Sequence, residues 1–298
     1  MSDVDGALVV VDKPAGWTSH QVVGRLRRML GTRKVGHAGT LDPMATGVLL
    51  VGVGRATRLL GHLSLTDKSY TATIRLGQET VTDDAEGEIT AAPGAPDVEP
   101  ARLEDSLARL RGTITQVPST VSAIKVDGQR AYARARRGED VVLAGREVTV
   151  TRFDVLASRP GVVGDVPVLD LDVEVDCSSG TYVRALARDL GRDLGTGGHL
   201  TALRRTRVGP FRLDEHHLGA DELVAGTADV PLLAMGDVAR RCFAVHEVEG
   251  AVVDDVRHGR PLDAAPAPGV FAVLDNDRLL ALYRAEGERS VPVAVFVT

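Results

Sequence analysis

The sequence contains few aromatic and sulfur-containing side chains. Only 3% of its 298 residues are aromatic, so aliphatic side chains must fill most of the core. The two cysteines, Cys177 and Cys242, have no paired spacing, which disfavours both a disulfide framework and a zinc site. We therefore expect no metal centre, and a location in the reducing cytoplasm.

Long apolar runs are also missing. No stretch approaches the roughly 20 residues that a membrane-spanning helix needs. Residues 1–5 are acidic and no apolar segment follows them, which argues against a secretory signal. We expect no membrane partner. A length of 298 residues exceeds the usual size of one domain, which predicts two domains or one large domain with a small appendage.

Familiar nucleotide-binding motifs are absent from the sequence. Gly52-Val53-Gly54 follows an expected strand, but Thr57 occupies the position where the dinucleotide fingerprint requires a third glycine. No segment fits the phosphate-binding loop of nucleotide triphosphatases. These motifs therefore give no support to a nucleotide cofactor.

Charge is unevenly distributed along the chain. The net charge of −6 argues by itself against a nucleic-acid partner, because Lys and Arg dominate phosphate binding. However, residues 79–105 hold nine acids and one base. Basic residues form three clusters, namely residues 25–34, then Lys125, Arg130, Arg134, Arg136 and Arg137, then Arg204, Arg205, Arg207 and Arg212. Such segregation is typical of a nucleic-acid-binding surface, although each cluster alone is also typical of a solvated face.

Strands and helices are mixed without regular alternation, which predicts an α+β fold. Thr18 and Gln21 have the spacing of a capping box, and Gly31 fits the end of the helix that follows. Strands are expected at residues 7–11, 48–53, 68–76 and 169–175, and helices from residues 18, 100 and 183. Short strands at 270–274, 279–283 and 291–297 predict a small β-rich C-terminal domain.

The glycine-rich segment 36–47 has no periodicity, so we expect a loop there. It carries Asp42 followed by Pro43, a pair that is typical of a turn. Three glycines, a histidine and two threonines surround the carboxylate, and a buried strand is expected directly afterwards. Such a backbone can approach a ligand closely. Local sequence therefore leaves a turn residue and a functional carboxylate both open.

Four runs of the sequence resemble the TruB family of tRNA pseudouridine-55 synthases, and they occur in the order of that family. The second is too long for a chance match to explain easily. The runs are Asp12-Lys13-Pro14-Ala15-Gly16-Trp17-Thr18-Ser19, the segment from Lys34 to Leu49, Lys68-Ser69-Tyr70, and Cys177-Ser178-Ser179-Gly180-Thr181-Tyr182-Val183-Arg184. The resemblance covers roughly residues 7 to 212.

The resemblance implies a chemistry that needs no cofactor. Uridine becomes pseudouridine when its N1–C1′ bond breaks and C5 bonds to C1′, with no redox change. Positive charge develops at the anomeric carbon, and a neighbouring carboxylate can stabilise it, attack it or move a proton. In this family that carboxylate corresponds to Asp42; nucleophile and base remain alternatives.

The resemblance also implies the residues around that carboxylate. Arg184 matches the arginine that keeps the carboxylate ionised, and Tyr70 the aromatic residue on which the flipped base stacks. Tyr182 and Leu203 match pocket-lining residues, and His37 an RNA-contacting histidine. For these side chains ordinary packing or exposure is the alternative. Contacts with the RNA backbone are expected from Arg130, Arg134, Arg136, Arg204 and Arg205.

The expected organisation is a pseudouridine-synthase domain at residues 1–235, with a mixed or antiparallel sheet and flanking helices, and a small PUA-like domain at 240–298. An RNA-gripping segment is expected at residues 118–146. Within it, Ser119 and Val121 replace a Pro and a Tyr of many relatives. We expect a monomer that modifies the T-arm of tRNA. An enzyme directed by a guide RNA and a tRNA-binding folding factor remain alternatives, and the absence of long basic tails disfavours the former.

Overall fold

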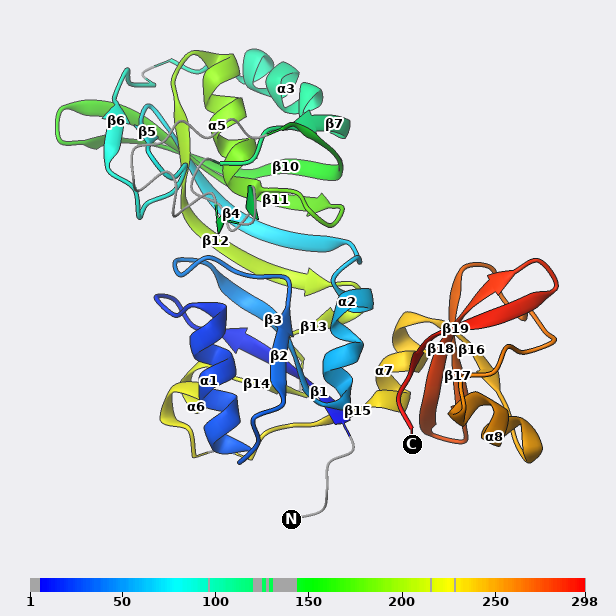
Figure 1. Cartoon of the computed structure of the whole chain (residues 1–298). Coiled ribbons are helices and arrows are strands. Elements are labelled where there is room, and N and C mark those ends of the chain that lie inside the picture. The colour runs from blue at the N-terminus through cyan, green and yellow to red at the C-terminus, as the bar shows by residue number, and fades with distance from the viewer. Residues whose placement is uncertain are drawn as a thin grey trace. The chain divides into compact units, whose positions relative to one another are not determined.

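The computed structural model describes residues 6–95, 97–119, 125–126, 129–130, 144–214, 216–227 and 229–297. Two compact units are present. Unit 1 comprises residues 1–43, 47–65 and 208–298, and unit 2 comprises residues 44–46 and 66–207. Figure 1 labels most of the elements of both. In the part of the chain described, no helix is long and apolar enough to cross a membrane.

Unit 1 contains a mixed sheet centred on β1 (Gly6–Lys13). This strand pairs antiparallel with β3 (Thr46–Gly54) and parallel with β14 (His217–Leu218). The other strands here are β2 (Val35–Ala38), which pairs with β3, β15 (Leu233–Ala234), which pairs with β1, and β13 (Phe211–Arg212). The helices here are α1 (Ser19–Met29), η1 (Arg55–Arg58), α2 (Leu60–Leu63), α6 (Ala220–Ala225) and α7 (Met235–Cys242).

Helix α1 forms as its sequence predicts. The capping box is present, because Thr18 Oγ1 accepts from the backbone N–H of Gln21 and the Gln21 side chain lies against the N–H of Thr18. The apolar face buries Val22 and Leu26 completely. After the helix Gly31 adopts a φ of +62°, a left-handed conformation that glycine reaches at little cost.

The expected loop at residues 36–47 is shorter than predicted, because residues 35–38 form β2. Gly36 hides this short strand from a search for alternation. Gly36 pairs with Gly52 of β3, and a Cβ on Gly52 would lie 2.9 Å from the carbonyl oxygen of Ala56 in η1. The close approach of η1 to β3 therefore explains why residue 52 is a glycine, although the dinucleotide motif is incomplete.

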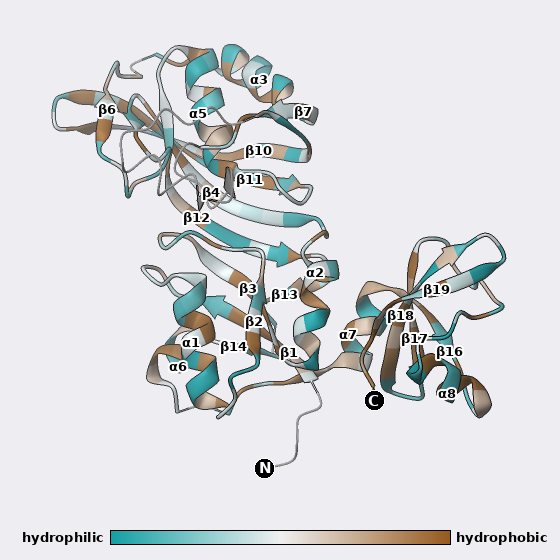
Figure 2. Cartoon of the chain, viewed as in Figure 1, coloured by the Kyte–Doolittle hydropathy of each residue, from teal (hydrophilic) through white to brown (hydrophobic). Residues whose placement is uncertain are grey.

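The expected β-rich C-terminal region is confirmed as a separate sheet. Its order is β16-β17-β18-β19, with helix α8 (Ala251–Arg257) against it. The strands are β16 (Ala244–Glu247), β17 (Val270–Asp275), β18 (Arg278–Glu286) and β19 (Arg289–Val295). Figure 2 shows these strands as largely apolar, whereas α1 carries several hydrophilic residues.

The C-terminal sheet belongs to the same compact unit as β1. Leu8 of β1 and Phe296 after β19 share one apolar cluster. Arg55 of η1 donates to the carbonyl oxygen of Phe296 at 2.9 Å, and Arg58 to that of Val295 at 2.7 Å. The domain boundary expected at residues 235–240 falls inside α7, and it stays a prediction.

Unit 2 contains the strand order β12-β4-β11-β10-β7. These strands are β12 (Gly198–Val208), β4 (Lys68–Leu76), β11 (Val166–Cys177), β10 (Arg146–Val163) and β7 (Gly112–Gln116). Short strands are β5 (Glu79–Thr80), β6 (Ile89–Ala91), β8 (Lys125–Val126) and β9 (Gln129–Arg130). The helices are α3 (Pro100–Arg109) and α5 (Val183–Leu194), which lie against each other. Both units combine helices with sheets, so the predicted α+β class is confirmed.

Candidate active site

Asp42 lies on the loop that leads from β2 to β3 in unit 1. Before it, the backbone N–H of Leu41 donates to Ser19 Oγ at 3.0 Å, and the same hydroxyl lies 3.2 Å from the Leu41 carbonyl oxygen. After it, the carbonyl oxygen of Pro43 accepts from the backbone N–H of Gly16 at 2.8 Å. The loop is thus fastened on both sides of the carboxylate, which remains partly exposed.

Lys13 also holds this loop in place. Its side chain is completely buried, and Nζ donates to the carbonyl oxygens of Pro14 at 2.8 Å, Trp17 at 2.6 Å and Pro43 at 3.1 Å. A buried ammonium is tolerated only when acceptors replace its lost hydration. Lys13 therefore joins the end of β1 to the turn that follows it and to the residue next to Asp42.

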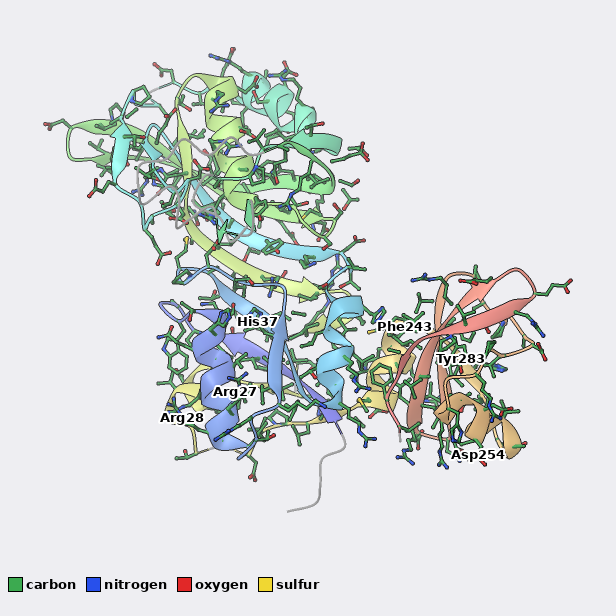
Figure 3. All side chains as sticks on the ribbon, in the orientation of Figure 1. Arg27, Arg28, His37, Phe243, Asp254 and Tyr283 are labelled. Carbon is green, nitrogen blue, oxygen red and sulfur yellow. The ribbon has the colours of Figure 1, made fainter. Side chains whose placement is uncertain are left out.

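His37 lies on β2, opposite Val51 of β3, and is half-buried. Its ring meets the ring of His20, on the first turn of α1, edge to face with centroids 5.2 Å apart. Figure 3 labels His37, and also Arg27 and Arg28 of α1, in this unit. Sequence reasoning did not single out His20, since one histidine on a helix carries no periodic signal.

Arg184 lies on the first turn of α5 in unit 2 and is only 5% exposed. Its NH1 donates to the carbonyl oxygen of Thr82 at 2.9 Å and lies 3.3 Å from Asp84 Oδ2. An arginine at this position would ordinarily be exposed, so the burial is a property of this site. Its fixed charge can keep a nearby carboxylate ionised.

Asp84 is a site residue that sequence reasoning missed. It lies in the acidic stretch at residues 79–105, where charged side chains would ordinarily be exposed, yet it is only 2% exposed. Its Oδ1 accepts from Thr82 Oγ1 at 2.5 Å and from the backbone N–H of Glu86 at 3.0 Å. The only local signal is the pair of adjacent acids between Thr80 and Gly87, which fits a structured turn as well as a solvated one.

Tyr182 is the N-cap residue of α5 and is fixed through its backbone. The fully buried side chain of Gln116 accepts from the Tyr182 N–H at 2.7 Å and donates to its carbonyl oxygen at 3.0 Å. The guanidinium of Arg146 lies 4.3 Å from the centre of the Tyr182 ring, a cation–π geometry. Sequence reasoning did not single out Gln116 or Arg146.

Tyr70 and Leu203 lie on neighbouring strands of unit 2, β4 and β12. They are 7% and 8% exposed, and α5 packs against β4. Unit 2 therefore holds Arg184, Tyr70, Tyr182 and Leu203 on adjoining elements, while Asp42 and His37 belong to unit 1. Within the described ranges, no three His, Cys, Asp or Glu side chains gather as a metal site would require.

The arginines expected to contact the RNA backbone differ in their exposure. Arg205 is only 1% exposed, so the structure does not support the contact expected of it. Its charge instead acts on Lys68, whose pKa it helps to lower. Arg204 is partly exposed and donates to Thr46 Oγ1 at 3.3 Å. For Arg130 only the backbone, in β9, is described. Arg134 and Arg136 lie outside the described residues.

The basic cluster at residues 25–34 is only partly a free surface. Arg25 donates to the carbonyl oxygens of Leu223 and Val224 at the end of α6, and Arg27 donates to that of Val35. Arg27 is nevertheless exposed, as are Arg28, Arg33 and Lys34. These four side chains carry the solvent-facing positive charge of this cluster.

Comparisons with known proteins cover almost the whole chain. Residues 27–183 match the N-terminal domain of TruB family pseudouridylate synthase, residues 184–228 the C-terminal domain of tRNA pseudouridylate synthase B, and residues 243–297 the C-terminal domain of tRNA pseudouridine synthase II.

Two relatives and one solved structure show how close the similarity is. A protein of Mycobacteroides abscessus named tRNA pseudouridine synthase B is 56% identical over 289 residues, covering 97% of this chain and 95% of that protein. One of the same name from Nocardia farcinica is 57% identical over 293 residues, covering 97% and 93%. A chain from an H/ACA RNP bound to a substrate RNA containing 2′-deoxyuridine superposes with a TM-score of 0.72 at 25% identity, covering 99% of this chain and 86% of that one. On this evidence the chain belongs to the TruB family of pseudouridine synthases.

Proposed function

We propose that this protein isomerises a uridine of tRNA to pseudouridine, and that the uridine is position 55 of the T-loop. The observation that carries the activity is the near-complete coverage of relatives, more than half identical, that are named tRNA pseudouridine synthase B. The alternative, a tRNA-folding factor with dispensable chemistry, is not favoured by these relatives. An enzyme directed by a guide RNA is disfavoured by the same names.

Asp42 is the catalytic carboxylate in this proposal. Its loop is held by Ser19 on one side and by Lys13 and Gly16 on the other, so little conformational entropy remains to be lost when a nucleotide binds. The carboxylate acts at C1′, where positive charge develops as the N1–C1′ bond breaks. The released uracil turns, and C5 bonds to C1′; the proton on C5 then leaves to solvent and N1 takes up a proton, so the product is an isomer of the substrate.

The side chains of unit 2 act on the flipped base and on the charge of Asp42. Tyr70 supplies an aromatic face for the uracil, which compensates for the stacking lost when the base leaves the loop. Arg184 is pre-positioned by Thr82 and Asp84, and its charge favours the ionised form of the catalytic carboxylate. Tyr182 and Leu203 line the pocket. No step in this sequence requires a redox cofactor.

The remaining parts of the proposal concern binding. His37, Arg204, Arg130, Arg134 and Arg136 contact the RNA, and Arg205 is not among them because it is buried. The protein acts as a monomer in the cytoplasm. Changing Arg134 and Arg136 together to Ala weakens tRNA binding, and each lost phosphate contact reduces the slope of log affinity against log salt by about 1. An unchanged slope would remove these residues from the interface.

The activity is tested on a T-arm transcript by chemical mapping of pseudouridine. The proposal expects modification at uridine 55, and none in a matched transcript with cytidine at that position. A protein that binds the transcript tightly and modifies nothing would support the folding-factor reading. Modification only after addition of a second RNA would support the guide-directed reading.

A further inference from the structure

Asp83 is the most unusual residue of unit 2 outside the set discussed so far. Its φ of +59° lies in the left-handed region, which non-glycine residues rarely adopt, although Asp and Asn tolerate it better than most. It precedes Asp84, the carboxylate beside Arg184. This conformation directs the side chains of Asp83 and Asp84 toward different partners.

The side chain of Asp83 binds the start of the segment that follows β7. Its Oδ2 accepts from Ser119 Oγ at 2.5 Å and from Arg188 NH1 at 3.3 Å. Arg188, one turn after Arg184 on α5, also donates through NH2 to the carbonyl oxygen of Val117 at 2.8 Å. The Arg188 guanidinium is further held by Asp189 at 2.9 Å. Residues 117–119 are therefore tied to both α5 and Asp83.

The backbone around Asp83 binds the candidate catalytic arginine. The carbonyl oxygen of Thr82 accepts from Arg184 NH1 at 2.9 Å, and the carbonyl oxygen of Asp83 accepts from the Leu200 N–H at 3.0 Å. Three consecutive residues, 82–84, thus contact Arg184, the stem at 117–119 and β12. A displacement of any one of these partners must move the loop that orients Arg184.

The Asp83–Arg188 pair is poorly solvated. Its side chains are only 13% and 19% exposed, and Ser119 is completely buried. Burial raises the pKa of Asp83, while the Ser119 hydroxyl and the charge of Arg188 oppose that rise. Removing one partner would leave a poorly solvated charge or hydroxyl without compensation, which costs more than the pair contributes. The pair is consequently a fixed connection rather than an exchangeable surface contact.

We propose that Asp83 and Arg188 are positioning residues that hold the stem 117–119 against the loop 82–84, and that this connection fixes Arg184 for catalysis. The proposal rests on the proposed function. The stem is the described start of the RNA-gripping segment expected at 118–146, so the connection links the RNA-binding side of unit 2 to the arginine that tunes the catalytic carboxylate. It acts on turnover, because neither side chain is itself assigned a contact with RNA.

The test compares Asp83→Asn, Arg188→Gln and the double variant with wild-type protein. Asn keeps the tolerance for the left-handed conformation and removes only the charge. We expect kcat to fall roughly tenfold or more in each single variant, with the Kd for tRNA within about twofold of wild type. The double variant should be no worse than the poorer single one, because both remove the same connection. Arg188→Lys should recover part of kcat.

A matched control is the Arg75–Asp170 pair of the same unit, whose side chains are 25% and 20% exposed and meet at 2.7 Å. Arg75→Gln and Asp170→Asn should lower the unfolding temperature without lowering kcat. A kcat loss as large in these controls, an unchanged kcat in Asp83→Asn and Arg188→Gln, or a rise in Kd with kcat retained would overturn the proposal. Inactive wild-type protein would instead contradict the proposed function, so the two failures are distinguishable.

Discussion

Lys13 shows how a single buried charge can shape the loop that carries Asp42. Its ammonium donates to three backbone carbonyl oxygens, one of them in the residue directly after Asp42. Replacing it by methionine of similar length keeps the volume and leaves these acceptors without their donor. Each unsatisfied buried group costs about 1–3 kcal/mol.

We therefore expect Lys13→Met to lower the free energy of unfolding by a few kcal/mol, and to lower kcat more than the affinity for tRNA. Chemical denaturation, followed by the fluorescence of Trp17, the chain's single tryptophan, measures the first effect on the same turn. Lys34→Met, at an exposed lysine of the same unit, is the control. Equal stability of the two variants would contradict the role assigned to Lys13.

Lys68 predicts a pH dependence of stability. Burial, and to a lesser extent the neighbouring Arg205, lowers its pKa from 10.5 to about 8. Between these values the unfolded chain binds more protons than the folded one, so this group makes stability rise with pH across that window. Below about pH 8 Lys68 is charged in both the folded and the unfolded chain, so its burial lowers the free energy of unfolding by a constant amount. The stabilising contribution is therefore gained, not lost, as the pH rises.

Unfolding temperatures of wild type and Lys68→Met at pH values from 7 to 10.5 check this expectation. The unfolding temperature of wild type relative to that of the variant should rise as the pH increases from about 8 to 10.5. A difference that stays constant would show that Lys68 titrates normally.

Individual residues also show the limits of sequence reasoning. Asp42, Arg184 and Tyr70 were found through a resemblance, because the residue types alone favoured a turn, an exposed arginine and ordinary packing. Asp84 and Lys13 are buried through contacts with residues up to a hundred positions away. No local pattern contains such partners, so sequence reasoning gave these residues no role.

At the scale of elements, the contact between α1 and β2 leads to a prediction. His20 meets His37 edge to face, and such pairs contribute about 0.5–1.5 kcal/mol beyond buried area. If His37 contacts RNA, His20→Ala should weaken tRNA binding by a factor of roughly 2 to 10, since the freed ring must be ordered again on binding. His20→Phe, which keeps an aromatic partner, should bind nearly as wild type. Equal weakening of tRNA binding in both variants would contradict a role for the ring contact and assign the effect to the His20 imidazole itself.

Elements differ in how well their sequences predict them. The capping box and apolar face of α1, and the alternation in β11, are local signals, and both elements form where expected. The long strand β10 was missed. Its pairing with β11 shifts register between Val150 and Arg152 and again between Val155 and Ala157, so the alternation of inward and outward side chains is broken. Pro160, near its end, further obscures the pattern.

At the scale of the whole molecule, the sequence predicted a β-rich C-terminal region but not its partner. Residues 208–298 form one compact unit with residues 1–43 and 47–65. This association depends on contacts between segments that are far apart in the sequence, such as Arg55 with Phe296. A linear reading places boundaries along the chain and therefore cannot find a unit assembled from distant segments.

The shared core of unit 1 predicts that its two ends unfold together. Phe296 is only 1% exposed and shares an apolar cluster with Leu8 and Val238. Phe296→Ala should cost about 3–5 kcal/mol and should shift the unfolding transition reported by Trp17, far away in the sequence. Val252→Ala, at a 40% exposed position of α8, should leave it almost unchanged. A Trp17 transition that does not respond to Phe296→Ala would show that the C-terminal sheet unfolds independently.

The role of Asp42 is tested most directly by the release of tritium from a T-arm transcript labelled at C5 of uridine. Pseudouridine formation joins C5 to C1′, so the label must leave as the product forms. We expect release by wild-type protein, and none by Asp42→Ala or Asp42→Asn protein that still binds the transcript. Abundant release by either variant would contradict the assignment of Asp42 as the catalytic carboxylate.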